Sequence, residues 1–343
     1  MTLETHSAAS VQARRLEWLW TDRVPLGAVT ILAGDGGLGK SLLTCELAAR
    51  LSRGELDGAL AGEGTPTLIV SAEDDAETTI KPRLMAAGAD LSLVHIAADA
   101  ATPFTLPDDQ NALTETVQAL GVRLVVLDPV VAFLSGRVDA HKDQSVRRAL
   151  APLAGLSRAL GVAVVAVLHV NRRDTSDASA RFSGSPAFRN AARSALVFGA
   201  DPTDPDGKDG PNRVLAQNKA NLTRPGLTSL SCRIDGARVG DGIETARMTF
   251  KGESTITADQ LVESPAVAQS PAMRFLTDAL ADGPRLAGQL EGEADEQGIT
   301  RQMLKTARKR LGVHTQRRGD LSAWEWSLPV EIGPIPINPL ASS

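Results

Sequence analysis

Aromatic residues are scarce in this chain of 343 residues, because phenylalanine, tryptophan and tyrosine together make up 3% and tyrosine is absent. A single-strand nucleic-acid binder that stacks bases on aromatic rings needs several exposed rings, so this class of protein is disfavoured. Cysteine is also rare, and Cys45 and Cys232 lie far apart without a C-x-x-C pair. This spacing argues against a zinc site or a disulfide scaffold and is typical of a reducing cytoplasm.

Long hydrophobic runs are missing as well, since the longest one covers only residues 162–168. A run of this length is far too short to cross a bilayer, and the polar N-terminus does not resemble a secretory signal. We therefore expect a soluble cytoplasmic protein without a membrane partner. The net charge of −5 gives no general attraction to nucleic acid, so any contact with DNA must come from local basic patches.

One glycine-rich stretch carries the strongest signal in the sequence. Residues 34–41 read GDGGLGKS and fill every fixed position of G-x-x-x-x-G-K-[ST]. The apolar, β-branched run 28–33 predicts a buried strand before it, and residues 42–51, followed by Gly54, predict a helix after it. Strand, loop and helix together predict a nucleoside-triphosphate site. The residues expected to hold the nucleotide are Gly34, Asp35, Gly36, Gly37, Leu38, Gly39, Lys40, Ser41 and Leu42.

The chemistry of such a loop depends on its geometry. Glycines let backbone N–H groups turn inward around phosphate oxygens, and the helix N-terminus adds its partial positive charge. Lys40 is expected to reach the β- and γ-phosphates, and the Ser41 hydroxyl is expected to ligate Mg²⁺. The sequence therefore predicts ATP and Mg²⁺ as the ligands of this loop.

The chain alternates strand-like and helix-like segments as far as residue 193. This βαβ rhythm predicts an α/β fold, a P-loop core with a mostly parallel sheet and right-handed crossovers. From Ser194 onwards short strands follow one another, which predicts an antiparallel extension at a sheet edge. The expected strands are 28–33, 65–71, 94–97, 122–128 and 162–169, then 195–198, 213–217 and 228–234, and the expected helices are 42–51, 76–88, 108–121 and 143–161.

Composition divides the chain into four parts. Residues 1–253 are expected to form the ATPase domain, and residues 254–271, with prolines and serines among small residues, a linker. Residues 272–329 show three helical segments followed by a hairpin-like stretch, the pattern of a winged helix-turn-helix. Residues 330–343 are rich in proline and predicted to be disordered. The segments of the winged helix are a first helix ended by Gly283, then 285–296, 300–312 and the hairpin 313–328.

Hydrolysis of ATP needs one carboxylate that organises the metal and another that positions the attacking water. Asp128 ends an apolar strand and suits the first role in the Walker B manner. Glu73 follows a strand at the edge where ligands bind in open α/β sheets, and suits the second role. Asp74 and Asp75 are adjacent substitutes, and an acid at a helix N-terminus is the alternative for Glu73. His169 ends another strand at this edge, as a sensor of the γ-phosphate or as a structural histidine.

Basic residues gather in two loops, 135–143 and 171–185, and on the predicted helix 300–312. The loops are either solvated or contact phosphate backbones without sequence preference. The helix presents basic residues at i, i+4 and i+7, which indicates a DNA-reading helix, with a solvated basic face as the alternative. The candidate DNA contacts are Arg137, Lys142, Arg172, Arg173 and Arg181 in the loops and Arg301, Lys305, Arg308 and Lys309 in the helix.

Six stretches taken together resemble the RecA-like ATPases of the RepA-type replicative helicase group, especially the AAA-family ATPases of actinobacterial phages and integrated elements. They are WLWTDRVPLGAVTILAGDGGLGKS, SAEDDAETTIKPRL, LVVLDPVVAFLSGRVDAHKDQSVRRAL, VLHVNRR, GSPAFRNAARSALVF and QNKANL. The resemblance implies a RecA-like core and a homo-hexameric ring that holds ATP between subunits. It implies that Glu73 is the catalytic carboxylate, Asp128 the Walker B acid and His169 the sensor. Arg193 and Lys219 resemble residues that reach the γ-phosphate of a neighbour's ATP.

Two functions from different classes follow from these features. The leading hypothesis is a DNA-stimulated ATPase that works as an oligomeric replicative helicase or translocase of a phage or mobile element. The alternative is an ATP-switched DNA-binding regulator or recombination mediator without motor activity. A small-molecule kinase is a weaker third choice, because it gives no role to the basic helix.

Overall fold

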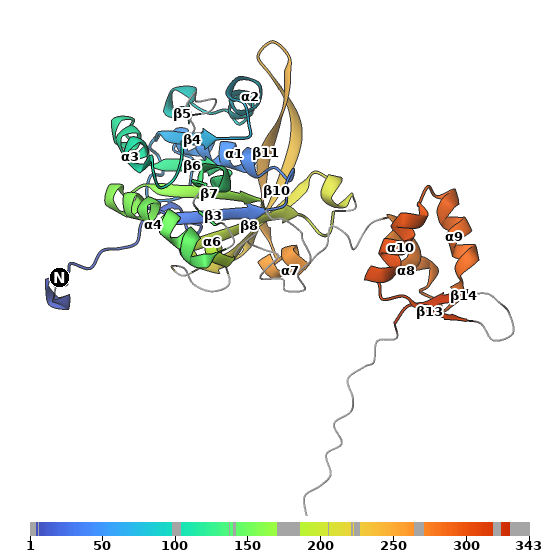
Figure 1. Ribbon diagram of the computed structural model, residues 1–343. Coiled ribbons are helices and arrows are strands. Elements are labelled where there is room, and N and C mark those ends of the chain that lie inside the picture. The colour runs from blue at the N-terminus through green and yellow to red at the C-terminus, as the bar shows by residue number, and fades with distance from the viewer. Residues whose placement is uncertain are drawn as a thin grey trace, which may run out of the picture. The chain divides into compact units, whose positions relative to one another are not determined.

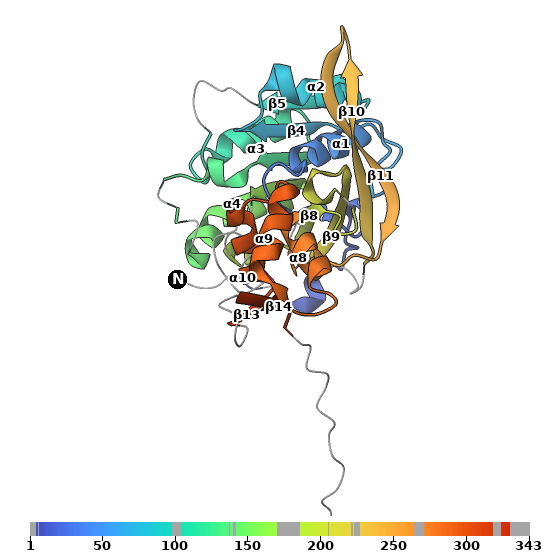
Figure 2. The same ribbon diagram turned by 90° about the vertical axis from the view of Figure 1, so that its right-hand side faces the viewer.

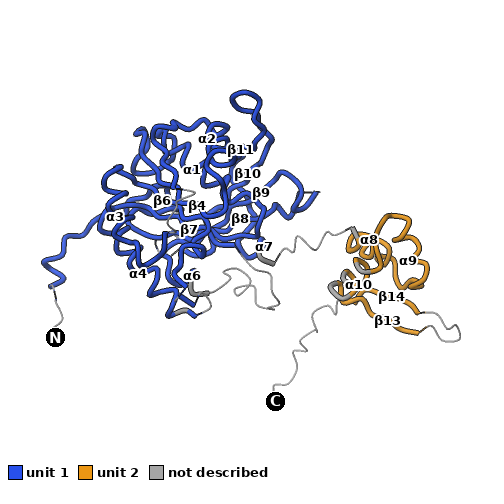
Figure 3. Tube along the Cα trace, turned by 45° about the horizontal axis from the view of Figure 1, so that its top comes forward, with its two compact units in different colours: residues 1–263 blue, residues 264–343 orange. Residues whose placement is uncertain are grey.

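The computed structural model describes residues 5, 7–97, 104–136, 138–139, 142–169, 186–204, 206–220, 222, 227–263, 271–317 and 324–329 (Figure 1). The chain forms two compact units, residues 1–263 and residues 264–343, which Figure 3 colours separately. Each unit buries hydrophobic residues of its own, as expected of a domain.

The larger unit is built on a nine-stranded sheet with the order β11-β10-β9-β8-β3-β7-β6-β4-β5 (Figure 1). The six strands from β8 to β5 run parallel to one another, which confirms the predicted α/β fold with a mostly parallel sheet. A two-stranded sheet, β1 (Trp18–Trp20) and β2 (Val24–Pro25), precedes it in the chain. The parallel strands are β3 Val29–Gly34, β4 Thr67–Ser71, β5 Val94–Ala97, β6 Leu124–Asp128, β7 Ala163–His169 and β8 Ser194–Ala200.

Helices cover both faces of the parallel strands, which is why these strands are apolar throughout. On β3, Leu32 belongs to the same core as Leu43 of α1, whereas Ile31 belongs to the core that contains Leu153 of α4. The segment 76–88, predicted as one helix, is a π-helical stretch followed by α2. The helices are α1 Lys40–Ser52, the π-helix η2 Ala76–Ile80, α2 Lys81–Ala86, α3 Gln110–Ala119 and α4 Asp143–Leu160, with 3₁₀ turns η1 Ala8–Ser10, η3 Leu91–Leu93 and η4 Val130–Phe133.

Strand β8 lies inside the sheet and pairs in parallel with β3, so the prediction that the antiparallel extension begins at residue 194 is wrong. The chain enters β8 from α6 (Pro186–Ala191), and the Arg193 N–H donates to the carbonyl oxygen of Val29, the first residue of β3. The two strands therefore start at the same end of the sheet. The antiparallel extension begins one strand later, with β9 (Asn212–Ala220).

Strands β10 (Ser229–Val239) and β11 (Ile243–Ser254) form a long hairpin beside α2 (Figures 1 and 2). Strand β11 was not predicted from the sequence, because only Met248 is deeply buried and the other residues are mostly polar or partly exposed. Helix α7 (Ala258–Glu263) packs on β8 and β9. The part of the predicted linker that forms α7 therefore belongs to the larger unit.

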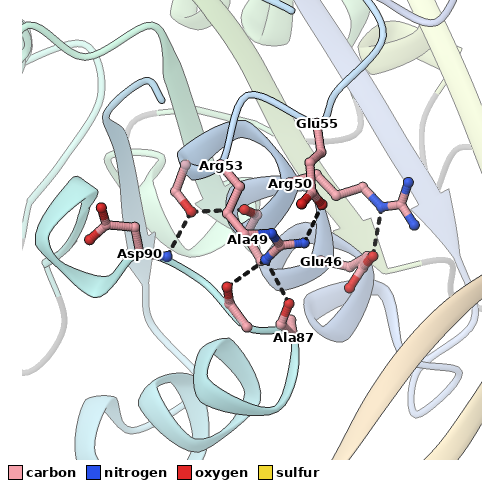
Figure 4. A network of polar contacts seen from close by, with 9 residues as sticks. Glu46, Ala49, Arg50, Arg53, Glu55, Ala87 and Asp90 are labelled. Atoms are coloured by element: carbon pink, nitrogen blue, oxygen red, sulfur yellow. Dashed lines mark hydrogen bonds and ion pairs between the residues drawn. The ribbon is translucent and has the colours of Figure 1, made fainter. Parts of the chain in front are cut away.

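A polar network fixes the C-terminal end of α1 (Figure 4). The Arg53 guanidinium donates to the carbonyl oxygens of Ala87 at 2.8 Å and Gly88 at 2.6 Å, and it pairs with Glu55 at 2.6 Å. The Ser52 hydroxyl accepts from the Asp90 N–H at 2.9 Å. These bonds join the end of α1 to the segment after α2, so the helix that follows the glycine-rich loop is anchored at its far end.

The described residues of the smaller unit form three helices and a three-stranded antiparallel sheet with the order β12-β14-β13. The predicted helix from Arg285 begins at Ala287 instead, because Arg285–Leu286 pairs with β14. Trp326 is buried among the helices at 2% exposure. None of the described helices of the chain is long and apolar enough to span a membrane. The elements are α8 Pro271–Ala279, β12 Arg285–Leu286, α9 Ala287–Glu296, α10 Arg301–Arg310, β13 His314–Arg317 and β14 Trp324–Ser327.

Candidate active site

The carboxyl ends of four parallel strands bring the predicted ATPase residues together. Gly34 at the end of β3 is level with His169 at the end of β7, and Ser71 of β4 is level with Asp128 of β6. Glu73 follows two residues after Ser71. Open α/β sheets bind ligands at this edge, so the sequence-derived residues for nucleotide and metal share one site.

Steric constraints explain why glycine occupies several positions of the loop. A Cβ on Gly34 would lie 2.1 Å from the Phe198 carbonyl oxygen of β8, so no side chain fits. Gly37 and Gly39 adopt φ values of 76° and 96°, which favour glycine. Helix α1 begins directly after Gly39, which leaves its first N–H groups free to meet phosphate oxygens.

The Lys40 side chain is 3% exposed and lies in the middle of this edge. Its Nζ donates to the carbonyl oxygens of Gly34 at 2.9 Å and Asp35 at 2.7 Å, and lies 3.3 Å from Nδ1 of His169. Burial lowers the pKa of Lys40, and the carboxylates of Asp128, Asp35 and Glu73 oppose this shift. The ammonium group is thus held by acceptors that a triphosphate can replace.

Asp128 and Ser41 have the properties of a magnesium site. Burial raises the pKa of Asp128, and its hydrogen bond with the Ser41 side chain opposes the shift. The Asp128 Oδ1 atom is buried and has no hydrogen-bond partner in the described part of the chain. No cluster of three or more His, Cys, Asp or Glu that could hold a metal occurs there either. Mg²⁺ uses few protein ligands together with phosphate oxygens and water, so these two residues fit the ion.

His169 links Lys40 to Glu73. The Lys40 ammonium is only a donor, so Nδ1 of His169 must accept and the ring proton lies on Nε2. This Nε2 lies 3.2 Å from Oε2 of Glu73, but the two groups do not have the alignment of a hydrogen bond. Glu73 is exposed, so its carboxylate is open to water at the edge where the phosphates are expected.

The two acids next to Glu73 are engaged elsewhere. Asp74 forms an ion pair with Arg83 at 2.6 Å, and its N–H donates to the Ser71 hydroxyl. Asp75 caps the π-helical stretch by accepting from the N–H groups of Glu77 and Thr78. Glu73 is therefore the acid of this turn that is least committed to the local fold.

Arg193 and Lys219 lie at the opposite, amino ends of the parallel strands, which form the amino edge of the sheet. Arg193 precedes β8 and bonds to the first residue of β3, whereas the glycine-rich loop follows the last residue of β3. Lys219 is paired in register with Ala195, and its Nζ donates to the carbonyl oxygens of Arg189 at 2.9 Å and Asn190 at 3.3 Å. Neither residue contributes to the phosphate site of its own chain.

A cavity of about 370 Å³ opens beside Arg193, between α4 and α6. Arg147 of α4 lines it together with Asn190 and Arg193, and the rest of the lining is small and apolar. Burial lowers the pKa of Lys219, and the neighbouring charges of Arg189, Arg147 and Arg193 lower it further. Four cations therefore lie close together at this edge. Sequence reasoning missed Arg147 and Arg189, although both lie within stretches that carry the family resemblance.

The predicted DNA contacts of the loops lie mostly outside the described residues, namely Arg137, Arg172, Arg173 and Arg181. Lys142 is 77% exposed and lies 3.3 Å from Asp139. The Lys309 side chain is also outside the described part. Arg301 and Lys305 of α10 are exposed, as the prediction of a basic face requires.

Arg308 differs from the other basic residues of α10. Its guanidinium stacks 3.8 Å from the centre of the Trp326 ring and donates to the Thr315 hydroxyl at 2.7 Å. Burial lowers the pKa of Arg308. The side chain joins the helix to the small sheet, and its contact with DNA stays a prediction.

The mostly parallel sheet and the glycine-rich loop at the ends of its strands are those of a RecA-like P-loop ATPase. Residues 1–175 match the AAA domain family AAA_25, and the chain belongs to this family. Two curated relatives are the DNA repair protein RadA of Mycobacterium tuberculosis strains CDC 1551 / Oshkosh and ATCC 25618 / H37Rv. Each is 27% identical over 149 residues, which are 43% of this chain and 28% of the relative. The match thus spans less than a third of the relatives' length.

Among solved structures, a KaiC-like protein from the archaeon Pyrococcus horikoshii OT3 is similar with a TM-score of 0.45 and 15% identity. The similarity covers 65% of this chain and 90% of that chain.

Proposed function

We propose that the protein is an oligomeric, DNA-stimulated ATPase that works as a helicase or translocase in the replication of a phage or mobile element. The observation that carries the proposal is the separation of charges on the sheet. One edge has a phosphate loop with two carboxylates, and the other has four cations beside a cavity. Cations that lie away from the nucleotide of their own chain can act on ATP held by a second copy.

At the carboxyl edge, backbone N–H groups of the loop and Lys40 hold the phosphates of ATP. Ser41 and Asp128 hold Mg²⁺, which neutralises charge on the phosphate oxygens when it is bound. Glu73 orients the attacking water and accepts its proton, because its exposed carboxylate is not used by the fold. His169 contacts both Lys40 and Glu73 and so senses whether the lysine has moved to the phosphates.

At the opposite edge, Arg193 and Lys219 act on the γ-phosphate held by a neighbouring copy. Cations that approach the transferred phosphoryl group stabilise the charge of the transition state. The cavity beside Arg193 is large enough for a phosphate group and its water. This arrangement favours a closed ring, and a homo-hexamer is the assembly that we propose.

DNA is the proposed partner, in the single-stranded form through the loops after β6 and β7 and in the duplex form through the smaller unit. Three helices with a small antiparallel sheet suit a winged helix, in which α10 contacts DNA phosphates through Arg301 and Lys305. The relatives of the core carry the name DNA repair protein, which supports action on DNA.

ATPase turnover with and without single-stranded DNA, followed by strand displacement on forked substrates, tests the proposal. We expect DNA to stimulate turnover and wild type, but not Lys40→Ala, to unwind. A protein that binds DNA and ATP but unwinds no fork of either polarity would instead be the ATP-switched regulator. In that case Glu73→Gln, which binds ATP and hydrolyses it slowly, keeps the DNA-bound function.

The role of α10 has a separate test. Arg301→Ala with Lys305→Ala should weaken duplex binding about equally on all sequences and reduce the slope of log K against log salt by about 2. Arg238→Ala is the control, because Arg238 is an exposed arginine of the larger unit that pairs with Glu244 at 2.7 Å. An unchanged salt slope would remove the smaller unit from the proposed DNA interface.

A further inference from the structure

The connection between β8 and β9 lies against the phosphate-binding loop and is organised by one buried arginine. Arg213, the second residue of β9, is 6% exposed. Its Nε donates to the Leu38 carbonyl oxygen at 3.1 Å. Its Nη atoms donate to the carbonyl oxygens of Gly210 at 2.6 Å, Asn212 at 2.8 Å and Lys208 at 3.2 Å. The guanidinium thus ties the glycine-rich loop to the connection through backbone oxygens on both sides.

Asp204 binds the backbone of this connection at Asp206 and Asn212. Its carboxylate is 2% exposed and accepts from the N–H groups of Asp206 and Asn212, both at 3.0 Å. Gly210 packs so closely on Asp204 that an added Cβ would lie 2.3 Å from Oδ1. Burial lowers the pKa of Arg213, and Asp204 and Asp209 oppose this, so the guanidinium remains charged. These contacts hold the backbone next to Arg213 in place.

The Leu38 carbonyl belongs to the same planar peptide as the N–H of Gly39. In a trans peptide the C=O and the N–H point in opposite directions, so a donor that fixes the oxygen also fixes the direction of the N–H. Arg213 holds this oxygen on the side of β9. The Gly39 N–H is thereby aimed away from β9, and Gly39 directly precedes α1, where the phosphates are expected.

Strand β10 restricts rotation of the Leu38–Gly39 peptide from the other side. A Cβ on Gly39 would lie 2.7 Å from Cδ1 of Ile234, so the chain at Gly39 already touches that side chain. With the oxygen of Leu38 bonded and Gly39 packed on Ile234, rotation of the peptide would break one contact or the other.

We propose that Arg213 is a positioning residue that sets the Leu38–Gly39 peptide for binding the phosphates of ATP. This role rests on the proposed nucleotide site. Arg213 does not touch the ligand, and acts through the backbone of the loop. Its effect falls equally on the ground state and the transition state, because the same N–H groups hold the phosphates in both. Loss of the bond therefore weakens nucleotide affinity and leaves the chemical step unchanged.

Arg213→Lys keeps the charge but cannot donate in four directions, so it isolates the geometry of the guanidinium. We expect the Kd for a fluorescent ATP analogue with Mg²⁺, and the KM for ATP, to rise about tenfold, while kcat stays within about twofold. The control is Arg233→Lys on β10, because Arg233 is paired in register with Asn212 and bonds to the Asp235 side chain at 2.7 Å. It should leave Kd and KM unchanged.

A folded Arg213→Lys protein with wild-type Kd overturns the positioning role, and so does a fall in kcat at unchanged KM. Wild type that fails to bind the analogue refutes the nucleotide site instead, so the two failures are distinguishable. Hydrogen exchange on wild type covers the case in which the variant does not fold. The nucleotide should protect residues 35–41 and 207–212 together, with the hairpin tip 240–242 unchanged. Protection of the glycine-rich loop alone contradicts the proposal.

Discussion

The two edges of the parallel sheet carry opposite chemistry. At the carboxyl edge the fold gathers glycines, one buried lysine and the carboxylates of Asp128 and Glu73. At the amino edge it gathers Arg193, Lys219 and Arg147 beside a cavity. The two groups lie at opposite ends of β3, and a strand of six residues is about 20 Å long. Under the proposed function, one copy provides the nucleotide and the other provides the charge that acts on it.

The largest effect is expected at the carboxyl edge. Lys40→Ala removes the ammonium from the phosphates in the ground state and in the transition state, so ATP turnover should fall by about 10³-fold or more. Phosphate release measures this change. Lys81→Ala, at an exposed lysine of α2, is the control and should retain full turnover. Residual turnover near wild type in Lys40→Ala would remove the loop from the catalytic site.

At the amino edge, Arg193→Ala and Lys219→Ala should each lower turnover by about 10²–10³-fold, because each removes a cation from the transition state. Neither should change the Kd for the nucleotide, since both lie away from the phosphate loop of their own chain. Lys40→Ala should change both the turnover and the Kd for the nucleotide, so a change in turnover alone distinguishes the amino edge from the carboxyl edge. A weaker Kd in Arg193→Ala would indicate that the two edges are not independent.

A smaller effect is expected for Arg147, which lines the same cavity from α4. Arg147→Ala should lower turnover by about tenfold, as expected when a charge acts at longer range than a direct donor. Arg148→Ala is the matched control, since Arg148 is the next residue of the helix, is exposed and does not line the cavity. Equal effects of the two substitutions would contradict a specific role of Arg147.

The smallest effect concerns stability. Burial raises the pKa of Asp128 above its unfolded value, so its ionisation costs folding free energy, and stability is lost as pH rises through the folded pKa. Asp128→Asn should raise the Tm of the nucleotide-free protein at pH 7–8 by a few degrees. The gain should disappear below the unfolded pKa of about 3.9. Thermal scans across pH measure it. Asp74→Asn is the contrast, because it breaks the ion pair with Arg83 and should lower Tm.

The sequence could predict which residues lie together at the carboxyl ends of the strands, because they occur in a short motif or directly at a strand end. The glycine-rich loop, Asp128 and His169 each close a strong apolar strand, and the pairing of parallel strands places them together. The same reasoning could not find Arg213, whose partners are backbone oxygens. Leu38 and Arg213 are also far apart along the chain, so no helical or strand periodicity relates them.

Two further limits have physical causes. The position of β8 depends on the crossover through α6, which is too short to give a helical pattern, so the strand was assigned to the antiparallel edge. Arg308 has the same helical spacing as Arg301 and Lys305, yet it stacks on Trp326. Helical periodicity gives the face of a residue but not the partner of its side chain.

Mixing two inactive variants tests directly whether the two edges meet between copies of the chain. Lys40→Ala has an intact amino edge, and Arg193→Ala has an intact phosphate loop. In a mixed assembly, some interfaces then combine the phosphate loop of Arg193→Ala with the amino edge of Lys40→Ala. Turnover of the mixture should exceed the sum of the separate variants several-fold. A mixture that stays at that sum, although the two proteins assemble together, would contradict the account.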